Sequence, residues 1–205
     1  MLRLLAVFLL AWPLFGQNAS HLSWPADKIS SLQFTLPYAN QVEIIGEVRA
    51  TIEIRYITEG EYQNELRLSP TPIGNQLHIE EQLSPSFDPF HDKLSAHKVM
   101  ASTLQIKLPT TKTLSLQIQQ ANSTIQGKIK KLLLKQNEGN VAILSAEIKG
   151  TILTNKAPIV LHNGNQNVFA LSKKGEVQGR FSSKAEADLI LESNSGNISH
   201  ASNRK

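Results

Sequence analysis

Five segments in the second half of the chain repeat one pattern: LSLQIQQANSTIQG (114–127), LLLKQNEGNVAIL (132–144), TILTNKAPIVLHNG (151–164), VFALSKKGEVQG (168–179) and LILESNSGNISH (189–200). Each segment has an alternating apolar and polar run, a turn of small or polar residues, and a second alternating run. Alternation with a period of two is typical of β-strands that bury one face. One such unit cannot bury its apolar face alone, so we expect the units to stack around a common core.

The turns can be aligned on the apolar residue that follows each of them. These residues are Ile125, Val141, Ile159, Val177 and Ile198, in steps of 16, 18, 18 and 21 residues. A small residue precedes each one, at Ser123, Gly139, Ala157, Gly175 and Ser195-Gly196. Small residues allow neighbouring backbones to approach closely at a corner. We therefore expect an all-β protein built as a parallel β-solenoid, or β-helix.

A β-sandwich of short antiparallel strands is the alternative fold. The uneven steps weaken the case for a regular solenoid, and Asn163-Gly164 is a strong signal for a two-residue hairpin. The same strands paired as hairpins would form two packed antiparallel sheets. The sequence leaves both architectures open.

The first half of the chain is predicted to be a strand-rich lead-in, residues 29–109. Alternating runs indicate strands at 29–36, 41–46, 49–57, 65–68, 76–80 and 100–108, and the pattern lapses in the proline-containing segment 84–99, which we expect to be a surface loop. The lead-in and the coils of 114–200 are expected to form one β-repeat domain over residues 20–200, followed by a polar tail at 201–205.

The N-terminus, MLRLLAVFLLAWPLFG (1–16), has the features of a secretory signal peptide. Arg3 precedes an apolar run that is shorter than the roughly 20 residues needed to span a bilayer. We assign residues 1–19 to the signal, with cleavage after Gly16 or Ala19; a buried core helix or a membrane anchor is the alternative. The mature protein is expected to be exported to the periplasm, cell surface or extracellular space, and not to be transmembrane.

Composition excludes several kinds of chemistry. The chain has no cysteine, which excludes disulfides, cysteine-ligated zinc and thiol catalysis. Residues 20–99 hold 6 basic and 11 acidic side chains, a net −5, whereas residues 100–205 hold 14 basic and 6 acidic, a net +8. A basic half can attract anionic polymers, although lysines also decorate the exposed faces and edges of ordinary sheets.

The chain resembles a family of bacterial adhesin-like β-repeat proteins, related to the head domains of predicted autotransporter adhesins. The residues that carry the resemblance are VEIIG (42–46) with IEIR (52–55), LQIKLP (104–109), and the turns NSGNI (194–198) and NEGNV (137–141), with looser matches at ANSTI (121–125) and KKGEV (173–177). KAPI (156–159) departs from the turn pattern, so we expect irregular stacking there. The resemblance spans residues 29–200 and implies a β-solenoid fold. The family's function is mostly unassigned, and it implies no catalytic residues.

The densest charge cluster is the candidate binding site. Lys128, Lys130, Lys131 and Lys135 are predicted to contact an anionic group or a phosphate- or sulfate-bearing glycan. No aromatic side chains lie between these lysines, so no nucleic-acid partner is expected.

Two sets of side chains are weaker candidates for chemistry. Glu186 and Asp188 lie on one strand face and could form an acid pair, although single solvent-facing carboxylates are commoner. Segment 88–97 carries aspartates and histidines that a metal could use, or that simply face water. We predict no catalytic, cofactor-binding or metal-binding residues, and no cofactor.

The resulting expectation is a non-catalytic exported β-repeat protein that acts in adhesion or envelope interaction, through an unknown surface protein or glycan. A polysaccharide-active β-helix enzyme, or an envelope scaffold or sensor-associated protein, is the alternative. An uncapped end of the stack would expose strand edges, so end-to-end self-association is also predicted.

Overall fold

A computed structural model describes residues 18–60, 63–87, 100–162 and 167–201. The described chain is all-β apart from one 3-10 turn, η1 (Ala26–Lys28). Its strands are β1 (Asn18–Pro25), β2 (Ser31–Leu36), β3 (Ala39–Glu47), β4 (Thr51–Gly60), β5 (Leu66–Ile73), β6 (Gln76–Leu83), β7 (Met100–Pro109), β8 (Thr113–Thr154), β9 (Ile159–Leu161), β10 (Val168–Ser172), β11 (Val177–Gln178), β12 (Leu189–Ser193) and β13 (Ile198–His200). Within these residues no helix has the length and apolar character that crossing a bilayer requires.

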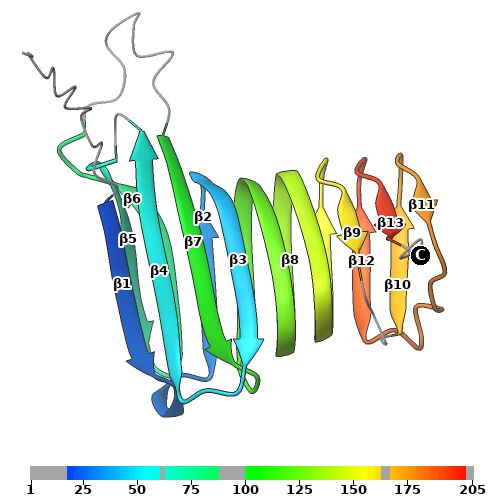
Figure 1. Ribbon diagram of the computed structural model, residues 1–205, viewed down its shortest axis with the longest axis horizontal. Helices are drawn as coiled ribbons and strands as arrows, with labels where there is room; N and C mark the ends of the chain where they lie inside the picture. Colours follow the sequence, from blue (N-terminus) through cyan, green and yellow to red (C-terminus); the bar gives the residue numbers. More distant parts are fainter. Residues whose placement is uncertain (1–17, 61–62, 88–99, 163–166, 202–205) are drawn as a thin grey trace, which may run out of the picture.

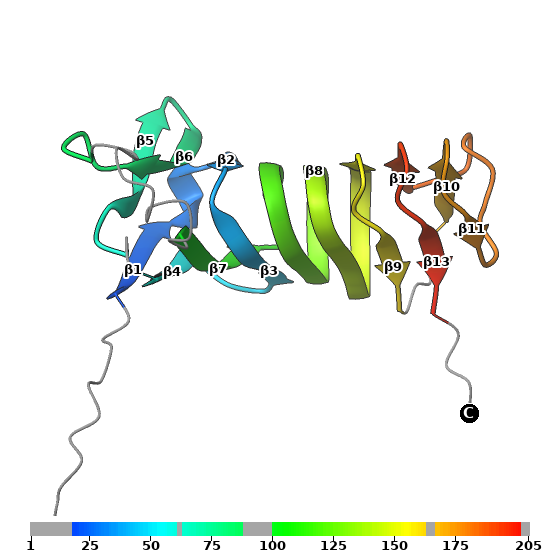
Figure 2. The ribbon, with the colours of Figure 1, turned by 90° about the horizontal axis from the view of Figure 1, so that it is seen from above.

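The strands belong to one mixed 13-stranded sheet that folds over into two layers (Figures 1 and 2). The first layer holds β5, β6, β2, β12 and β10, together with the parts of β8 that pair with β2 and β12. The second layer holds β1, β4, β7, β3, β9, β13 and β11, with the parts of β8 that pair with β3 and β9. Strand β8 passes through both layers and therefore joins them into one sheet. We call each passage through the first layer and then the second a coil.

Most pairing along the stack is parallel. Strands β2, β3, β9, β12 and β13 all pair in parallel with β8 or with the next coil. Antiparallel pairs join β1 to β4, β4 to β7 and β5 to β6, at the lead-in end. Of these pairs only β5 and β6 form a hairpin, whereas β1, β4 and β7 are brought together from distant parts of the chain. The coils bring equivalent strands back in the same direction, so their pairing is parallel.

The coils within β8 and β9 recur at a constant sequence interval, which we call the coil interval. Val141 pairs with Ile159, and side-chain hydrogen bonds at the same separation of 18 join Asn140 to Asn122 and Asn155 to Asn137. The residue equivalent to Val141 in the preceding coil is therefore Ser123 and not Ile125, so the shorter first step of the predicted alignment is wrong. The small residue at that corner is Ala121, which sequence alone did not distinguish from Ser123.

The interior is filled by columns of aliphatic side chains. Leu32, for example, pairs with Leu77 on one side and Leu114 on the other, and all three are almost completely buried. Burying a side chain of this size contributes about 1.5–3 kcal/mol relative to leaving it exposed. A single coil cannot bury its apolar side chains alone. Packing between coils along these columns buries them and so holds the coils together.

The order of the coils in space differs from their order in the chain at both ends. The β2–β3 coil lies between β6–β7 and β8. At the other end the β12–β13 coil lies between β8–β9 and β10–β11, as Figure 1 also shows. The last coil in the sequence, 189–200, is therefore not the last coil in the stack. The outer coil is partly covered by segment 179–187, where Ser182 N donates to Val168 O at 2.7 Å and Phe181 packs on the core.

The corner between the layers is tightly packed and requires small residues. Gly139 has a φ of 92°, and a Cβ there would lie 2.0 Å from the carbonyl oxygen of Ala121. Gly196 stands at the same position of its coil, where a Cβ would lie 2.2 Å from Ala157 O. The expected irregularity at 156–159 is also wrong: Ala157 is fully buried, and Ile159 pairs in register with both Val141 and Ile198.

We predict that Gly139→Ala destabilises the protein by about 2–5 kcal/mol, because it combines a left-handed φ with a collision against backbone. Gly74→Ala is the matched control, since Gly74 also has a positive φ, of 61°, but has no atom within 4 Å of the new methyl. The control should lose only about 1–2 kcal/mol. Urea unfolding of both variants measures the difference, and equal losses would show that corner packing contributes nothing.

Candidate functional site

An open groove of about 390 Å³ runs across the coils at the corner where the first layer passes to the second. We call it the corner groove. It is lined by Thr35, Leu36, Pro37, Gln117, Ile118, Gln119, Lys135, Gln136, Asn137, Leu153, Thr154, Asn155 and Asn194. Because neighbouring strands are about 4.8 Å apart, a groove that crosses five coils is about 19 Å long. It therefore suits an extended ligand that lies along the stack.

Repetition of the coil puts like residues in rows along the groove. The floor row is Leu36, Ile118, Gln136 and Thr154; one wall is Thr35, Gln117, Lys135 and Leu153; the other is Pro37, Gln119, Asn137, Asn155 and Asn194. Four of the outward side chains in the second wall are amides. The groove thus offers a row of uncharged donors and acceptors and one ammonium group.

The asparagines of the second wall form a hydrogen-bonded ladder. Asn155 Nδ2 donates to Asn137 Oδ1 at 2.7 Å, and Asn194 Nδ2 donates to Asn155 Oδ1 at 3.0 Å. Each side-chain amide has two N–H groups and an oxygen with two lone pairs, so one bond in each direction leaves capacity for a ligand. The ladder also fixes the orientation of the amides before a ligand arrives.

The groove floor is held by polar side chains that point inward. Gln136 is buried, and its Nε2 donates to Ala121 O at 2.7 Å and Glu138 O at 2.9 Å, with Asn140 O at 3.3 Å. Its Oε1 accepts from Ser123 Oγ at 2.6 Å. One side chain therefore satisfies the backbone of two neighbouring coils at the corner.

We predict that Gln136→Leu lowers the free energy of unfolding by about 2–4 kcal/mol, because the buried carbonyl of Ala121 loses its partner, at a cost of about 1–3 kcal/mol, and the part-buried carbonyls of Glu138 and Asn140 lose theirs. Gln119→Leu is the control, since Gln119 is exposed on the groove wall. It should change stability by less than about 0.5 kcal/mol. Thermal and urea unfolding measure both, and a wild-type stability for Gln136→Leu would contradict the role of this side chain.

The four predicted lysines do not form one site. Lys135 lines the corner groove. Lys128, Lys130 and Lys131 are exposed where β8 passes from the second layer back to the first, and Lys128 is paired with Glu147 at 2.6 Å. The groove amides were missed because they are spread through the sequence; the signal was the recurrence of Gln119, Asn137 and Asn155 at the coil interval.

The predicted acid pair is also separated into two local contacts. Asp188 forms an ion pair with Lys149 at 3.1 Å, and Glu186 accepts a hydrogen bond from Ser183 Oγ at 3.0 Å. The histidines and aspartates of segment 88–97 lie outside the described residues, as do the signal segment 1–17 and Asn163-Gly164. Among the described residues, no group of three histidines or carboxylates could hold a metal ion.

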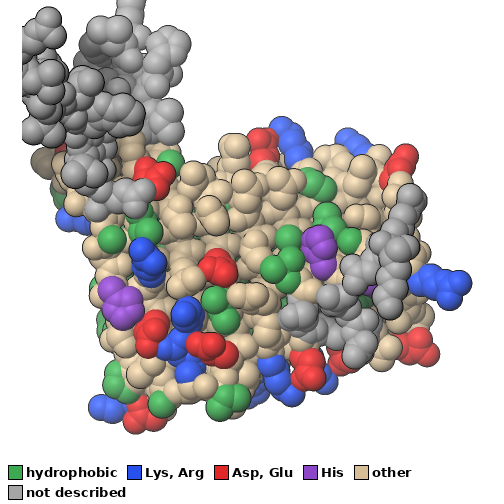
Figure 3. All heavy atoms as spheres, viewed as in Figure 1, with side chains coloured by type: hydrophobic (Ala, Val, Ile, Leu, Met, Phe, Trp, Pro, Cys, Tyr) green, Lys and Arg blue, Asp and Glu red, His purple; other side chains and the backbone are tan. Residues whose placement is uncertain are grey.

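Among the described residues, the exposed face of the second layer carries no charge patch of one sign. Lysine, arginine and carboxylate side chains are intermingled across it in Figure 3. Gln105 and Gln126 both donate to Glu43 on this face, at 2.6 and 3.3 Å. Both oxygens of the Glu43 carboxylate therefore already have a partner in the protein, so the corner groove remains the better candidate.

A buried carboxylate, Glu81, lies at the lead-in end of the interior. It accepts hydrogen bonds from Tyr56 Oη at 2.8 Å, Ser102 Oγ at 2.5 Å and Tyr38 N at 2.7 Å. Burial, together with the nearby carboxylate, raises the pKa of Tyr56 well above its ordinary value. The donors come from three separate segments, so Glu81 ties β6 to β4 and β7 and its role is structural.

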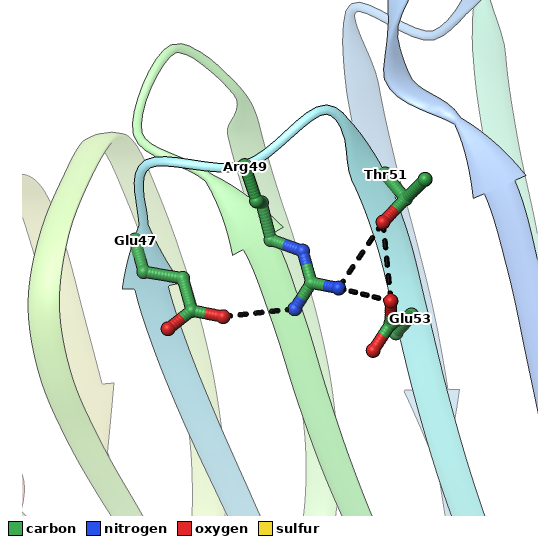
Figure 4. A network of polar contacts seen from close by, with 4 residues as sticks. All are labelled: Glu47, Arg49, Thr51 and Glu53. Carbon is green, nitrogen blue, oxygen red and sulfur yellow. Dashed lines mark hydrogen bonds and ion pairs between the residues drawn. The ribbon is translucent and has the colours of Figure 1, made fainter.

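A second polar cluster closes the turn between β3 and β4 (Figure 4). Arg49 contacts Glu47 at 2.9 Å and Thr51 at 3.1 Å, and it also pairs with Glu53. The hydrogen bond from Arg49 holds the pKa of Glu53 below its ordinary value, and Lys128 does the same for the pKa of Glu147. A lowered pKa in the folded state stabilises the fold at neutral pH, and that contribution is lost as the pH falls through the folded value.

We predict that Arg49→Gln raises the pKa of Glu53 toward its ordinary value, about 4.3 for a free glutamate, and leaves that of Glu147 unchanged. Lys128→Gln should raise the pKa of Glu147 and leave that of Glu53 unchanged, which makes each variant the control for the other. Carboxyl carbon shifts followed by NMR through the acid range measure both values. A Glu53 pKa that does not move would mean that Arg49 does not hold the turn in solution.

Comparison with known proteins adds information on the fold. No protein-family model matches the chain, and no curated protein matches it. The chain is similar to the crystal structure of a putative cell adhesion protein from Clostridium sporogenes, with a TM-score of 0.59 and 12% identity over 90% of this chain and 99% of that one. A putative adhesin from Bacteroides fragilis matches at a TM-score of 0.36 and 10% identity, over 90% and 97% of the two chains. The first similarity shows a shared fold alone, and the second is too distant in fold to support an argument.

Proposed function

We propose that this protein is an exported, non-catalytic interaction protein of the bacterial cell envelope or surface, and that its corner groove binds an extended acidic glycan. The observation that carries the proposal is the row of oriented amides beside Lys135, aligned along the stack. Hydroxyl and carboxylate groups that recur along a polymer match donors and acceptors that recur along the coils. Lys135 supplies a partner for a carboxylate, and the basic balance of residues 100–205 supports an anionic ligand.

The groups that line the groove favour binding over catalysis. Among the described residues of the lining there are amides, hydroxyls, aliphatic side chains and one ammonium, with neither a carboxylate nor an imidazole. Side-chain amides do not act as general acids or bases near neutral pH, whereas glycan hydrolysis in most known families uses a pair of carboxyl groups. This composition is the reason that we prefer an interaction protein to a polysaccharide-active enzyme.

The proposed architecture is a parallel β-solenoid of the adhesin-like kind. It is supported by the constant coil interval, by the parallel registers from β2 to β13, and by the fold shared with a protein named for cell adhesion. Export is supported by the signal-like segment 1–16. Strand β1 begins at Asn18, so cleavage after Gly16 would leave it whole, whereas cleavage after Ala19 would remove its first two residues.

We predict that the mature full-length protein binds tetragalacturonate, an acidic oligosaccharide, and binds neutral cellotetraose more weakly. Lys135→Gln should weaken tetragalacturonate binding about 10-fold or more, because a hydrogen bond to a charged group contributes about 1.5–3 kcal/mol. Lys131→Gln is the matched control: it removes the same charge from the same coil outside the groove and should leave binding unchanged. Isothermal titration calorimetry measures the affinities.

Two outcomes would overturn parts of the proposal. Equal losses in Lys135→Gln and Lys131→Gln, or the absence of binding to either sugar, would remove the groove as a glycan site. Shortening of the oligosaccharide after long incubation, followed by mass spectrometry, would contradict the non-catalytic assignment.

A further inference from the structure

We infer that the inserted coil, β12–β13 (residues 189–200), is a removable element, and that the protein has a second state in which β10 and β11 pair directly with β8 and β9. In the structure this coil separates two coils that would otherwise be neighbours. In the second state it is released and the stack closes behind it. The inference concerns the fold and does not depend on the proposed ligand.

The registers carry the inference. The coil interval of the stack is the sequence separation between Val141 and its partner Ile159. Val168, which begins β10, follows Gly150 by this same interval, and Val177, which begins β11, follows Ile159 by it as well. The β10–β11 coil therefore already has the spacing needed to stack directly on β8–β9. The inserted coil is the element that departs from the spacing.

The side chains of the two outer coils are interchangeable column by column. Opposite Gly150, Ile152, Thr154, Ala157 and Ile159, the inserted coil presents Leu189, Leu191, Ser193, Gly196 and Ile198, and the outer coil would present Val168, Ala170, Ser172, Gly175 and Val177. In each column the residue of the outer coil is of the same kind as that of the inserted coil: aliphatic, serine or glycine. Ser172 even repeats the corner contact of Ser193, because its Oγ accepts from Gly175 N as Ser193 Oγ accepts from Gly196 N.

The chain between the coils has the length that the second state needs. The link from Ile143 to Gly150, which joins adjacent coils, is as long as the link from Leu161 to Val168. In the structure Leu161 and Val168 belong to coils that lie two steps apart. The inserted state is nevertheless the major one, since Leu189, Leu191 and Ile198 are fully buried in it. The second state is therefore the minor one, and a bond that forms only in that state is the appropriate way to detect it.

Release of the coil would also change the corner groove. Asn194 completes the amide ladder on Asn155, and Lys173 lies one coil interval after Asn155 in the sequence. In the second state Lys173 takes the place of Asn194, which adds a second cation to the groove. If the proposed function is correct, an acidic ligand would favour the second state, because a ligand shifts a conformational equilibrium toward the state that it binds better.

An engineered disulfide tests the second state in the full chain, which has no cysteine of its own. Thr151 pairs with Ile190, and Ile190 pairs with Phe169, so Thr151 and Phe169 lie two strand spacings apart. That distance, about 9.6 Å, is beyond the roughly 7 Å Cα separation that a disulfide can bridge, whereas the second state brings the pair to about 4.8 Å. The variant is Thr151→Cys with Phe169→Cys, oxidised slowly at low protein concentration and analysed by intact mass.

The matched control is Gln33→Cys with Leu133→Cys. These residues flank Ser115 in the same layer at the same double spacing, but Ser115 and Leu133 are already separated by the coil interval, so the coil between them is not an insertion. We expect the Thr151–Phe169 pair to form its intramolecular disulfide on the order of 10-fold faster than the control pair, whose geometry forbids the bond without unfolding. Equal rates would overturn the inference, because global unfolding would then explain both.

A second measurement uses the wild-type chain and guards against a variant that fails to fold. Hydrogen exchange should be faster for the amides of 189–193 than for those of their pairing partners 150–154, because only the former are released. Equal protection of the two strands would overturn the inference. Tetragalacturonate should accelerate the Thr151–Phe169 disulfide if it binds; a ligand that binds without this effect would overturn the coupling to the groove and leave the proposed function intact.

Discussion

The structure depends on the hydrogen bonding of the backbone at the corner, where each coil leaves the first layer and enters the second. A buried carbonyl or N–H group without a partner costs more than most single contacts contribute. In four coils the partner at this corner is a side chain of the coil itself, at one recurring position: Gln136, Thr154, Ser193 and Ser172. In the two coils nearer the lead-in the same position is occupied by the apolar residues Leu36 and Ile118. Thr154 Oγ1 donates to Ala157 O at 2.7 Å, and the two serine hydroxyls accept from backbone N–H groups three residues later. A polar residue in the core is therefore part of the corner in these four coils.

The corner also determines the shape of the surface outside it. Only a small residue fits where one turn lies on the next, because a Cβ at Gly139 or Gly196 would lie 2.0 or 2.2 Å from a carbonyl oxygen of the neighbouring coil. The residue directly after the recurring polar position points outward, and in three successive coils it is Asn137, Asn155 or Asn194. The groove wall is thus the outer side of the same turn. Substitutions that alter the wall and those that alter the corner can be separated, because their side chains point in opposite directions.

Alternating hydrophobicity was sufficient to predict that the chain is all-β. It also predicted most of the strands, including β2, β3, β4, β6 and β7 in the lead-in. Strand β1 was missed, because its first four residues are exposed and only Leu22 and Trp24 alternate with exposed neighbours. The small corner residue was placed at Ser123 instead of Ala121, since both are small and only backbone proximity distinguishes them. The lysine cluster was compact in the sequence, but the corner groove draws a few residues from each coil. A site built in this way becomes visible only when the coil interval is known.

The order of the coils in space could not be predicted from the sequence, for a physical reason. When each coil offers a similar column of aliphatic side chains, several orders of stacking bury similar apolar area, so local pattern cannot choose among them. The choice then depends on differences in side-chain size and in the links between coils. Leu189 and Leu191 fill their columns more fully than Val168 and Ala170 do, and this difference favours the inserted order. Coils of different sequence can stack together because their columns are similar. For the same reason, an alternative order of coils at the end of the stack is close in free energy to the observed one.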